Sequence, residues 1–322
     1  MNLSNLRVVI MGASSGIGAA TAVAFARQGA HLVLGARGQD GLDDVVERCH
    51  AAGGQASAIR VDATDAEAVS DFAYDARAIL GGIDLWFSNV GAGVVGKFAD
   101  VPIADHHQVV ELNLVTHMND AHAVLPIFLE QDHGIWVNMI SSGGYVAASY
   151  AAAYSASKFG LKGFSEALRA ELGQRPRIHV CDVYPTFVDT PGFSHAGNYT
   201  GARLSYPPGA LSPDTVADAV VKLARRPRAT TVVGAPETIM KMTRLAPDLI
   251  ASGMNRFLDA WSKRADRADD TEGALYTAPR GASGIRSGQR PHERSRNNNQ
   301  KALAVGAVVV GAAVALQLLR KR

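Results

Sequence analysis

Near the start of the chain, a short apolar run leads directly into a glycine-rich turn, Val8-Val9-Ile10-Met11-Gly12-Ala13-Ser14-Ser15-Gly16-Ile17-Gly18. A helical pattern begins in this turn, and a second apolar run follows at His31–Gly35. Glycines permit a tight turn and a close approach of the backbone, while the start of the helix offers free N–H groups and a positive dipole. Strand, glycine turn, helix and strand in this order therefore predict a binding site for the pyrophosphate of a dinucleotide.

The same alternation of apolar runs and amphipathic stretches continues through residues 6–235. Continuous apolar runs are typical of strands that are buried on both faces, as in parallel sheets. They occur at Leu6–Met11, His31–Gly35, Ala56–Val61, Ile83–Ser88, Ile135–Ile140, Arg177–Val183 and Thr230–Gly234. Helices are predicted between them at Ile17–Gln28, Ala66–Leu80, His107–Gln131, Ala151–Leu172 and Pro213–Arg225. The predicted fold class is therefore α/β, a single doubly wound parallel sheet (Rossmann fold) with right-handed crossovers.

The sequence changes character after residue 235. Residues 237–263 have the pattern of one or two amphipathic helices interrupted at Pro247, so we expect the main domain to span residues 1–263. Residues 264–301 are rich in Gly, Ser, Arg, Asp and Asn and have no periodicity, which predicts a flexible linker. Residues 302–319 then carry no charge and a single polar side chain, Gln317, between basic flanks.

This apolar tail is long enough to enter a membrane. Its 18 residues would form a helix about 27 Å long, close to the hydrocarbon thickness of about 30 Å. We therefore predict a transmembrane or membrane-anchoring helix at 302–319; the alternative is a helix docked on protein, because a helix that is apolar on every face must be buried. Both flanks are basic, so the orientation stays open.

Composition excludes several other classes. The chain is 47% hydrophobic and 19% charged with a net charge of +2, which gives no reason to expect a nucleic-acid partner. Cys49 and Cys181 lack metal-ligand spacing and cannot form a disulfide framework, so we expect both to be buried and the compartment to be reducing. The ten histidines form no ligand motif, and we predict no metal.

The second strand indicates which dinucleotide binds. An acidic residue normally stands at its end in NAD enzymes and holds the ribose 2′-hydroxyl. Here Gly35 and Ala36 are followed by Arg37, and no carboxylate occurs before Asp40. A guanidinium can pair with a 2′-phosphate through its planar fork, so the sequence favours NADP.

A tyrosine and a lysine at helical spacing supply a candidate acid/base pair. Tyr154 and Lys158 stand four residues apart at the start of a helical pattern and so share one face. A phenol titrates near pH ~10, and its pKa must fall by about 3 units for acid/base work near neutrality. The Lys158 ammonium and an oxidised nicotinamide ring would both favour the phenolate. Upstream, the strand 135–140 ends in Ser141 and Ser142, at the edge where ligands bind in such sheets.

Together these motifs resemble the short-chain dehydrogenase/reductase family in its Rossmann-fold form, over about residues 5–235. The glycine motif of the family matches residues 11–18, with Met11 in place of threonine. Its other motifs match Asp62 after the third strand, Asn89 and Gly91 after the fourth, Asn113 in the next helix, the triplet Ser142, Tyr154 and Lys158, and finally Pro185, Val188 and Thr190.

The resemblance implies a role for each of these residues. Ser142 would orient the substrate oxygen, Tyr154 would exchange the proton, and Lys158 would bind the nicotinamide ribose and lower the tyrosine pKa. Asn113 would hold a water that links Lys158 to solvent. The cofactor-binding residues expected in this way are Gly12, Ser14, Ser15, Gly16, Ile17, Gly18, Arg37, Asp62, Asn89, Gly91, Tyr154, Lys158, Pro185, Val188 and Thr190.

One departure from the family pattern leaves the choice of serine open. The spacing from Ser142 to Tyr154 is one residue shorter than usual, and Ser141 would restore it. We favour Ser142, because the strand-end pattern usually places the active hydroxyl second and a shorter loop at 143–150 would absorb the difference. Thr186 also replaces a glycine of the family, and would crowd the cofactor slightly.

These observations predict an NADP(H)-dependent oxidoreductase that interconverts a ketone or aldehyde and an alcohol. Aromatic residues in the segment 193–208 either pack in the core or belong to a lid over an apolar substrate, and the identity of the substrate and the reaction direction stay open. The alternative is a membrane-tethered, non-catalytic NADP-binding module, against which the complete catalytic set argues; a sugar-nucleotide epimerase or dehydratase would need a larger substrate domain. The resemblance also implies a homo-oligomer, and the need for a cytosolic NADP pool places residues 1–300 in the cytoplasm.

Overall fold

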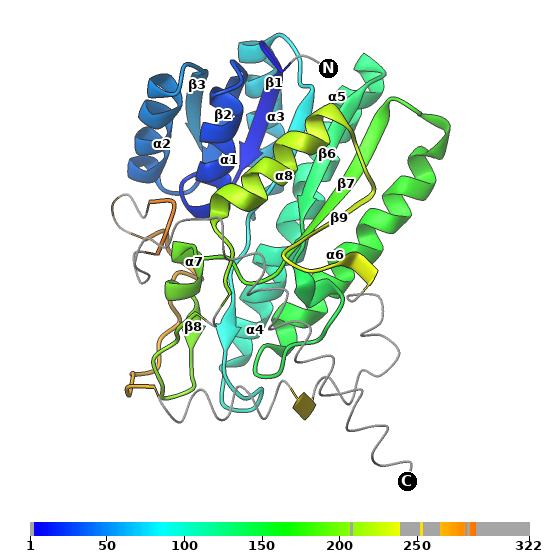
Figure 1. Cartoon of the computed structure of the whole chain (residues 1–322). Coiled ribbons are helices and arrows are strands. Elements are labelled where there is room, and N and C mark those ends of the chain that lie inside the picture. The colour runs from blue at the N-terminus through cyan, green and yellow to red at the C-terminus, as the bar shows by residue number, and fades with distance from the viewer. Residues whose placement is uncertain are drawn as a thin grey trace.

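The predicted strands form one parallel sheet (Figure 1). The computed structural model describes residues 3–206, 209–238, 252–253, 265–279, 281 and 284–287. The sheet has the order β3-β2-β1-β4-β6-β7-β9, so the strand order reverses direction between β1 and β4. Its strands are β1 (Arg7–Met11), β2 (His31–Ala36), β3 (Gln55–Arg60), β4 (Leu85–Ser88), β6 (Gly134–Met139), β7 (Ile178–Pro185) and β9 (Thr230–Val233). Each differs from its predicted bounds by two residues or fewer at either end, and the α/β prediction is confirmed.

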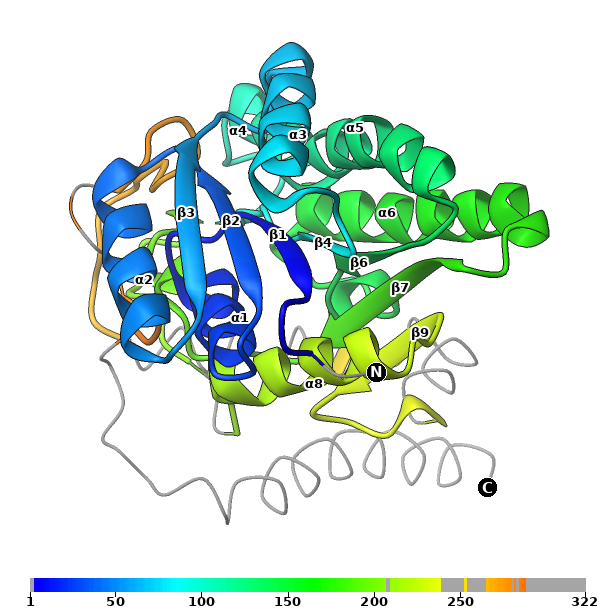
Figure 2. The ribbon, with the colours of Figure 1, turned by 90° about the horizontal axis from the view of Figure 1, so that it is seen from above.

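Helices cover both faces of this sheet (Figure 2). On one face lie α1 (Gly16–Ala26), α2 (Gln39–Ala51) and α8 (Pro213–Arg225). On the other lie α3 (Ala66–Leu80), α5 (Thr116–Gln131) and α6 (Ala152–Glu171). An apolar cluster fills each interface: Phe25 and Leu34 belong to the first, and Phe72 packs edge-on against Trp86 at 5.6 Å between ring centroids in the second.

Local sequence explains where several helices begin and end. Asp65 caps α3 by accepting the backbone N–H groups of Glu67 and Ala68, and Gly81 ends it in the left-handed conformation.

The helix α2 was not among those predicted, because its apolar residues are few and polar residues surround them. The single helix expected at 107–131 is instead α4 (Ile103–Val110), a π-helical turn η1 (Glu111–Val115) and α5. Such turns often occur at functional sites.

Shorter elements complete the carboxyl edge of the sheet. They are β5 (Val94–Val95), the 3₁₀ turn η2 (Ser142–Gly144), α7 (Pro191–Ser194) and β8 (Gly197–Asn198), whereas the 3₁₀ turn η3 (Leu172–Gln174) joins the end of α6 to the start of β7. β5 and β8 pair in parallel, which joins the loop after β4 to the segment after β7. Both cysteines are buried, as predicted.

Part of the segment 264–301 differs from the linker prediction. Residues 265–279, which we call the C-terminal arm, lie beside β8 (orange in Figure 1) and form antiparallel bridges from Thr271 to Asn198 and from Arg267 to Ala202. Leu275 in the arm is only 1% exposed. The arm is fixed by long-range backbone pairing and one buried side chain, which composition and periodicity do not reveal.

Two other predictions, the helices at 237–263 and the anchor at 302–319, concern residues that the structure describes only in small part or not at all. Most of residues 237–263, and all of the proposed anchor at 302–319, lie outside the described residues. Within the described part, no helix is long and apolar enough to cross a membrane.

Candidate active site

A cavity of about 790 Å³ opens at the carboxyl edge of the sheet, next to the point where the strand order reverses. Ligands of open α/β sheets bind at this position, because the loops there diverge and leave a crevice. The cavity extends from Arg37 and Asp62, past the glycine turn, to Tyr154 and Lys158. Every site residue expected from the sequence lines it, with the exception of Gly18.

The glycine turn is shaped by two close backbone approaches. Gly12 has φ +80°, a left-handed conformation that favours glycine. A Cβ atom on Gly18 would lie 2.1 Å from the carbonyl oxygen of Gly12, so only glycine fits where α1 passes behind the turn. Asn89 donates from Nδ2 to the same carbonyl at 3.1 Å and fixes the turn against the loop after β4. Gly18 and Asn89 therefore stabilise the shape of the glycine turn.

The start of α1 faces the cavity. Ser15 stands at the N-cap position, and its side chain makes no capping bond within the part of the chain that the structure describes. The N–H of Gly16 donates to the carbonyl of Gly284 at 3.0 Å. The positive end of the α1 dipole therefore lies beside the cavity, which suits an anionic ligand, while the N–H of Gly16 is already bonded within the protein.

Arg37 lies at the far end of this cavity, half-buried against the C-terminal arm. Its terminal nitrogens donate to the carbonyls of residues 274–276 at distances of 3.2 to 3.5 Å. Asp62 lies nearby, and its carboxylate accepts the backbone N–H and the hydroxyl of Thr64 at 3.0 and 2.8 Å. A cation and a fixed acid therefore border the same end of the cavity.

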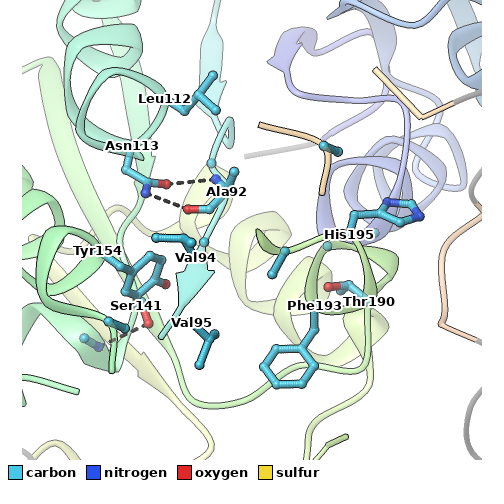
Figure 3. A pocket seen from close by; sticks show the side chains of 18 of the residues that line it. Ala92, Val94, Val95, Leu112, Asn113, Ser141, Tyr154, Thr190, Phe193 and His195 are labelled. Atoms are coloured by element: carbon cyan, nitrogen blue, oxygen red, sulfur yellow. Dashed lines mark hydrogen bonds between the residues drawn. The ribbon is translucent and has the colours of Figure 1, made fainter. Parts of the chain in front are cut away.

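Ser141, rather than Ser142, is the serine whose side chain lies against Tyr154, which favours the alternative that the sequence left open. The Ser141 hydroxyl lies beside the Tyr154 side chain, where it lowers the pKa of the phenol in part, and it accepts the N–H of Gly143 at 3.1 Å. Figure 3 shows Ser141 and Tyr154 next to each other at the cavity wall. Ser142 begins the turn η2, where its carbonyl accepts the N–H of Tyr145 at 2.9 Å. The Ser141 position restores the usual spacing, so no shortened loop is needed.

Lys158 lies one helical turn below Tyr154. Its ammonium donates to the Met139 carbonyl at 3.2 Å and lies 5.9 Å from the centroid of the Tyr154 ring. Burial lowers the pKa of Lys158 to about 7. Burial also raises the pKa of Tyr154 above its ordinary value, while the hydrogen bond with Ser141 lowers it in part. In the protein alone, the dry surroundings therefore favour the neutral form of both groups.

Asn113 clamps the loop after β4. It stands in the π-helical turn η1, and its amide bonds the main chain of Ala92 twice, accepting the N–H at 3.0 Å and donating to the carbonyl at 2.7 Å (Figure 3). A Cβ on Gly91 would lie 2.6 Å from Asn113 Oδ1 and 3.6 Å from Lys158 Nζ. Only a glycine at position 91 allows the loop after β4 to lie this close to both Asn113 and Lys158.

A buried histidine, to which the sequence analysis gave no role, lies beneath this loop. His117 Nε2 lies 2.8 Å from the Val90 carbonyl, and Nδ1 lies 2.6 Å from the Asn138 amide. Burial lowers the pKa of His117 to about 3, and the charge of Lys158 adds to this effect. The neutral ring has a single N–H, so it donates to only one of its two oxygen neighbours, the Val90 carbonyl and Asn138 Oδ1, while Asn138 Nδ2 donates to the Ser165 hydroxyl at 2.8 Å. The helical spacing of His117 from Asn113 was the only signal in the sequence.

The wall near Tyr154 is largely apolar. Val94 and Val95 from β5 and Phe193 from α7 face the cavity in Figure 3. The segment after α7, predicted to be a lid, contributes Tyr199 and Tyr206 to the wall. The C-terminal arm adds further wall residues that the sequence did not predict: Ala274, Ala278 and Pro279.

Comparison with known proteins adds independent information. A family model described as short chain dehydrogenase matches residues 7–198. A ketoacyl reductase of Nostoc (HetN) is 30% identical over 243 residues, which covers 76% of this chain and 83% of the relative. A 1-deoxy-11-beta-hydroxypentalenate dehydrogenase of Streptomyces avermitilis is 34% identical, with 68% of this chain and 81% of the relative covered.

Solved structures show the same fold. An alcohol dehydrogenase from the archaeon Thermococcus sibiricus, complexed with 5-hydroxy-NADP, matches with a TM-score of 0.62 at 25% identity, covering 71% of this chain and 96% of that one. A metagenomic short-chain oxidoreductase in complex with NADP matches with a TM-score of 0.62 at 29% identity, covering 72% and 98%.

Proposed function

Because the chain belongs to the short-chain dehydrogenase family and is one of its oxidoreductases, we propose that it interconverts a ketone or aldehyde and an alcohol, using NADP(H) and Tyr154 as the general acid/base. The observation that supports this best is the contact of the Tyr154 side chain with Ser141, above the buried ammonium of Lys158, in the wall of a cavity that also includes the glycine turn.

The residues present fit a dinucleotide. The glycines let the turn approach Asn89 and Thr190 closely, and the positive end of the α1 dipole lies beside the part of the cavity where a pyrophosphate would bind. Ser14, Ser15 and Ile17 would bind along the turn, and Asp62, which lines the cavity near Arg37, would contact the adenine. Arg37 supplies the cation for a 2′-phosphate, and the two NADP-bound structural neighbours agree with that choice.

The nicotinamide end of the cavity would be held by Lys158 and by the segment after β7. Lys158 is positioned to bond the ribose hydroxyls, and Val188 and Thr190 line the wall where the carboxamide would lie. When bound, the nicotinamide supplies or accepts the hydride. Asn113 holds the loop after β4 in place beside Lys158, and we assign to it the water that links Lys158 to solvent.

Ser141 and Tyr154 would act on the substrate oxygen. In reduction, the Ser141 hydroxyl donates to the carbonyl oxygen, which polarises the bond, and Tyr154 donates its proton as the oxygen gains negative charge. In oxidation, Tyr154 must accept the alcohol proton as a phenolate. The ammonium of Lys158 stabilises that phenolate, and the phenolate in turn stabilises the charged lysine, so the two groups offset the cost of burial together.

The apolar wall favours an apolar substrate. Val94, Val95 and Phe193 would contact its carbon skeleton next to the reacting oxygen. Burial of such surface contributes about 25 cal/mol per Å², so an aliphatic or cyclic skeleton gains more than a small polar one.

A screen of apolar ketones, aldehydes and alcohols tests this proposal. We expect NADPH-dependent turnover by the wild type, and a loss of about 10³-fold in kcat for Tyr154→Phe with an unchanged NADPH dissociation constant. The matched control is Tyr74→Phe, a 58% exposed tyrosine on α3, which should keep full activity. Tight NADPH binding without turnover of any substrate class would instead favour the non-catalytic module.

A further inference from the structure

The C-terminal arm makes an unexpected contact with the cofactor end of the cavity. Arg37 Nη1 donates to the carbonyls of Leu275 and Tyr276 at 3.5 and 3.3 Å, and Nη2 donates to that of Ala274 at 3.2 Å. Three consecutive backbone carbonyls therefore surround one guanidinium. Because Arg37 and the arm are separated by more than two hundred residues, only the tertiary fold joins them.

The arm is held in place without help from Arg37. Leu275 is 1% exposed and belongs to the apolar cluster that contains Val94 and Leu112. The Tyr276 hydroxyl donates to the buried carboxylate of Asp105 at 2.7 Å. The arm is thus a fixed frame against which the long side chain of Arg37 rests.

This frame leaves part of the guanidinium available. A guanidinium has five N–H groups in a rigid fork. Among the described residues, the arm carbonyls take three of these groups, which leaves Nε–H and one terminal N–H of Arg37 to form a bidentate pair with an anion. An arginine whose rotamer is already fixed loses less conformational entropy when the anion arrives.

We propose that the C-terminal arm is a positioning element for the 2′-phosphate of NADP: residues 274–276 hold Arg37 in the orientation that recognises this phosphate. The proposal rests on the assignment of NADP(H) as the cofactor. Since NADH has a hydroxyl where NADPH has the phosphate, the arm raises the affinity for NADPH and leaves that for NADH nearly unchanged. The arm thus contributes to the preference for NADPH over NADH, although it lies outside the nucleotide-binding motifs.

Displacing the arm tests this idea in the full-length protein. Tyr276→Ala removes the anchor to Asp105, and the exposed Tyr74 on α3 provides the matched control, Tyr74→Ala. Dissociation constants of NADPH and NADH are measured by the fluorescence of the bound nicotinamide. We expect the ratio of the NADH to the NADPH constant to fall about three- to tenfold in Tyr276→Ala, with the NADH constant itself changing less than twofold.

A double-mutant cycle with Arg37→Ala decides whether the arm acts through Arg37. In the Arg37→Ala background, Tyr276→Ala should have no further effect on the ratio. An equal fall in both backgrounds, or an equal loss of NADH and NADPH affinity, would overturn the proposal, because the arm would then support the whole cavity. A wild type that prefers NADPH but whose ratio is unchanged by Tyr276→Ala also refutes the inference alone. A wild type without preference refutes the NADP assignment as well.

Discussion

The sharpest prediction concerns the two adjacent serines at the end of β6. Ser141→Ala removes the hydroxyl that contacts Tyr154, while Ser142→Ala removes a hydroxyl of the same kind one residue later. Both serines are half-buried and line the cavity, so the two substitutions are matched in chemistry and in exposure. Only the first removes a group that can polarise the substrate carbonyl.

The structure sets the size of each effect. Loss of one preorganised donor to a developing oxyanion costs about 10²- to 10³-fold in kcat, or roughly 3–4 kcal/mol. Ser141 also accepts the N–H of Gly143 at 3.1 Å, so Ser141→Ala should lower the free energy of unfolding by about 1 kcal/mol. Ser142 holds the turn through its backbone carbonyl, which alanine retains, and we expect Ser142→Ala to change kcat by no more than about twofold.

Steady-state kinetics in both directions provide the assay. The hydrogen bond with Ser141 lowers the pKa of Tyr154, so Ser141→Ala should also shift the rising limb of the alcohol-oxidation pH profile to higher pH. Ser141→Thr, which keeps the hydroxyl, should recover most of the rate. A larger loss of kcat in Ser142→Ala than in Ser141→Ala would show that the assignment of the serine is wrong.

Three further predictions concern charged groups. Lys158→Met should move the rising limb of alcohol oxidation up by about one to three pH units, since it removes the cation 5.9 Å from the Tyr154 ring. Asp84 is partly desolvated, but its bonds to Arg7 keep its pKa below the usual range. Its contribution to stability is therefore complete above the unfolded pKa of about 4 and is lost as the pH falls through the folded value. Chemical denaturation should show Asp84→Asn to be less stable than wild type at pH 7, with the difference shrinking in acid. Burial raises the pKa of Asp120 to about 7. The folded state thus binds this proton more tightly, stability falls as the pH rises from about 4 to about 7, and Asp120→Asn should raise the melting temperature more at pH 9 than at pH 5.

Local sequence was sufficient for much of this protein. The strands of the seven-stranded sheet were predicted to within two residues, because most of them, such as β1 and β4, are continuous apolar runs between turn residues, as strands buried on both faces must be. The glycine turn was predicted because Gly12 and Gly18 occupy places that no side chain can enter. The four-residue spacing of Tyr154 and Lys158 predicted that they share a helix face, which depends only on the chain around them, while the family motifs marked them as candidates for catalysis.

Only the tertiary structure shows the contacts between segments that are distant in the sequence. Ser141 and Ser142 are chemically identical, and only the path of the chain after β6 directs one hydroxyl to Tyr154. The composition of residues 264–301 indicated a free linker, yet residues 265–279 pair with the β8 segment and bury Leu275. The sequence alone therefore determined the fold, the glycine turn and the shared helix face of Tyr154 and Lys158, because local patterns specify them. The choice of serine and the contact of the arm with Arg37 required the folded chain, because they arise between residues that are close only in space.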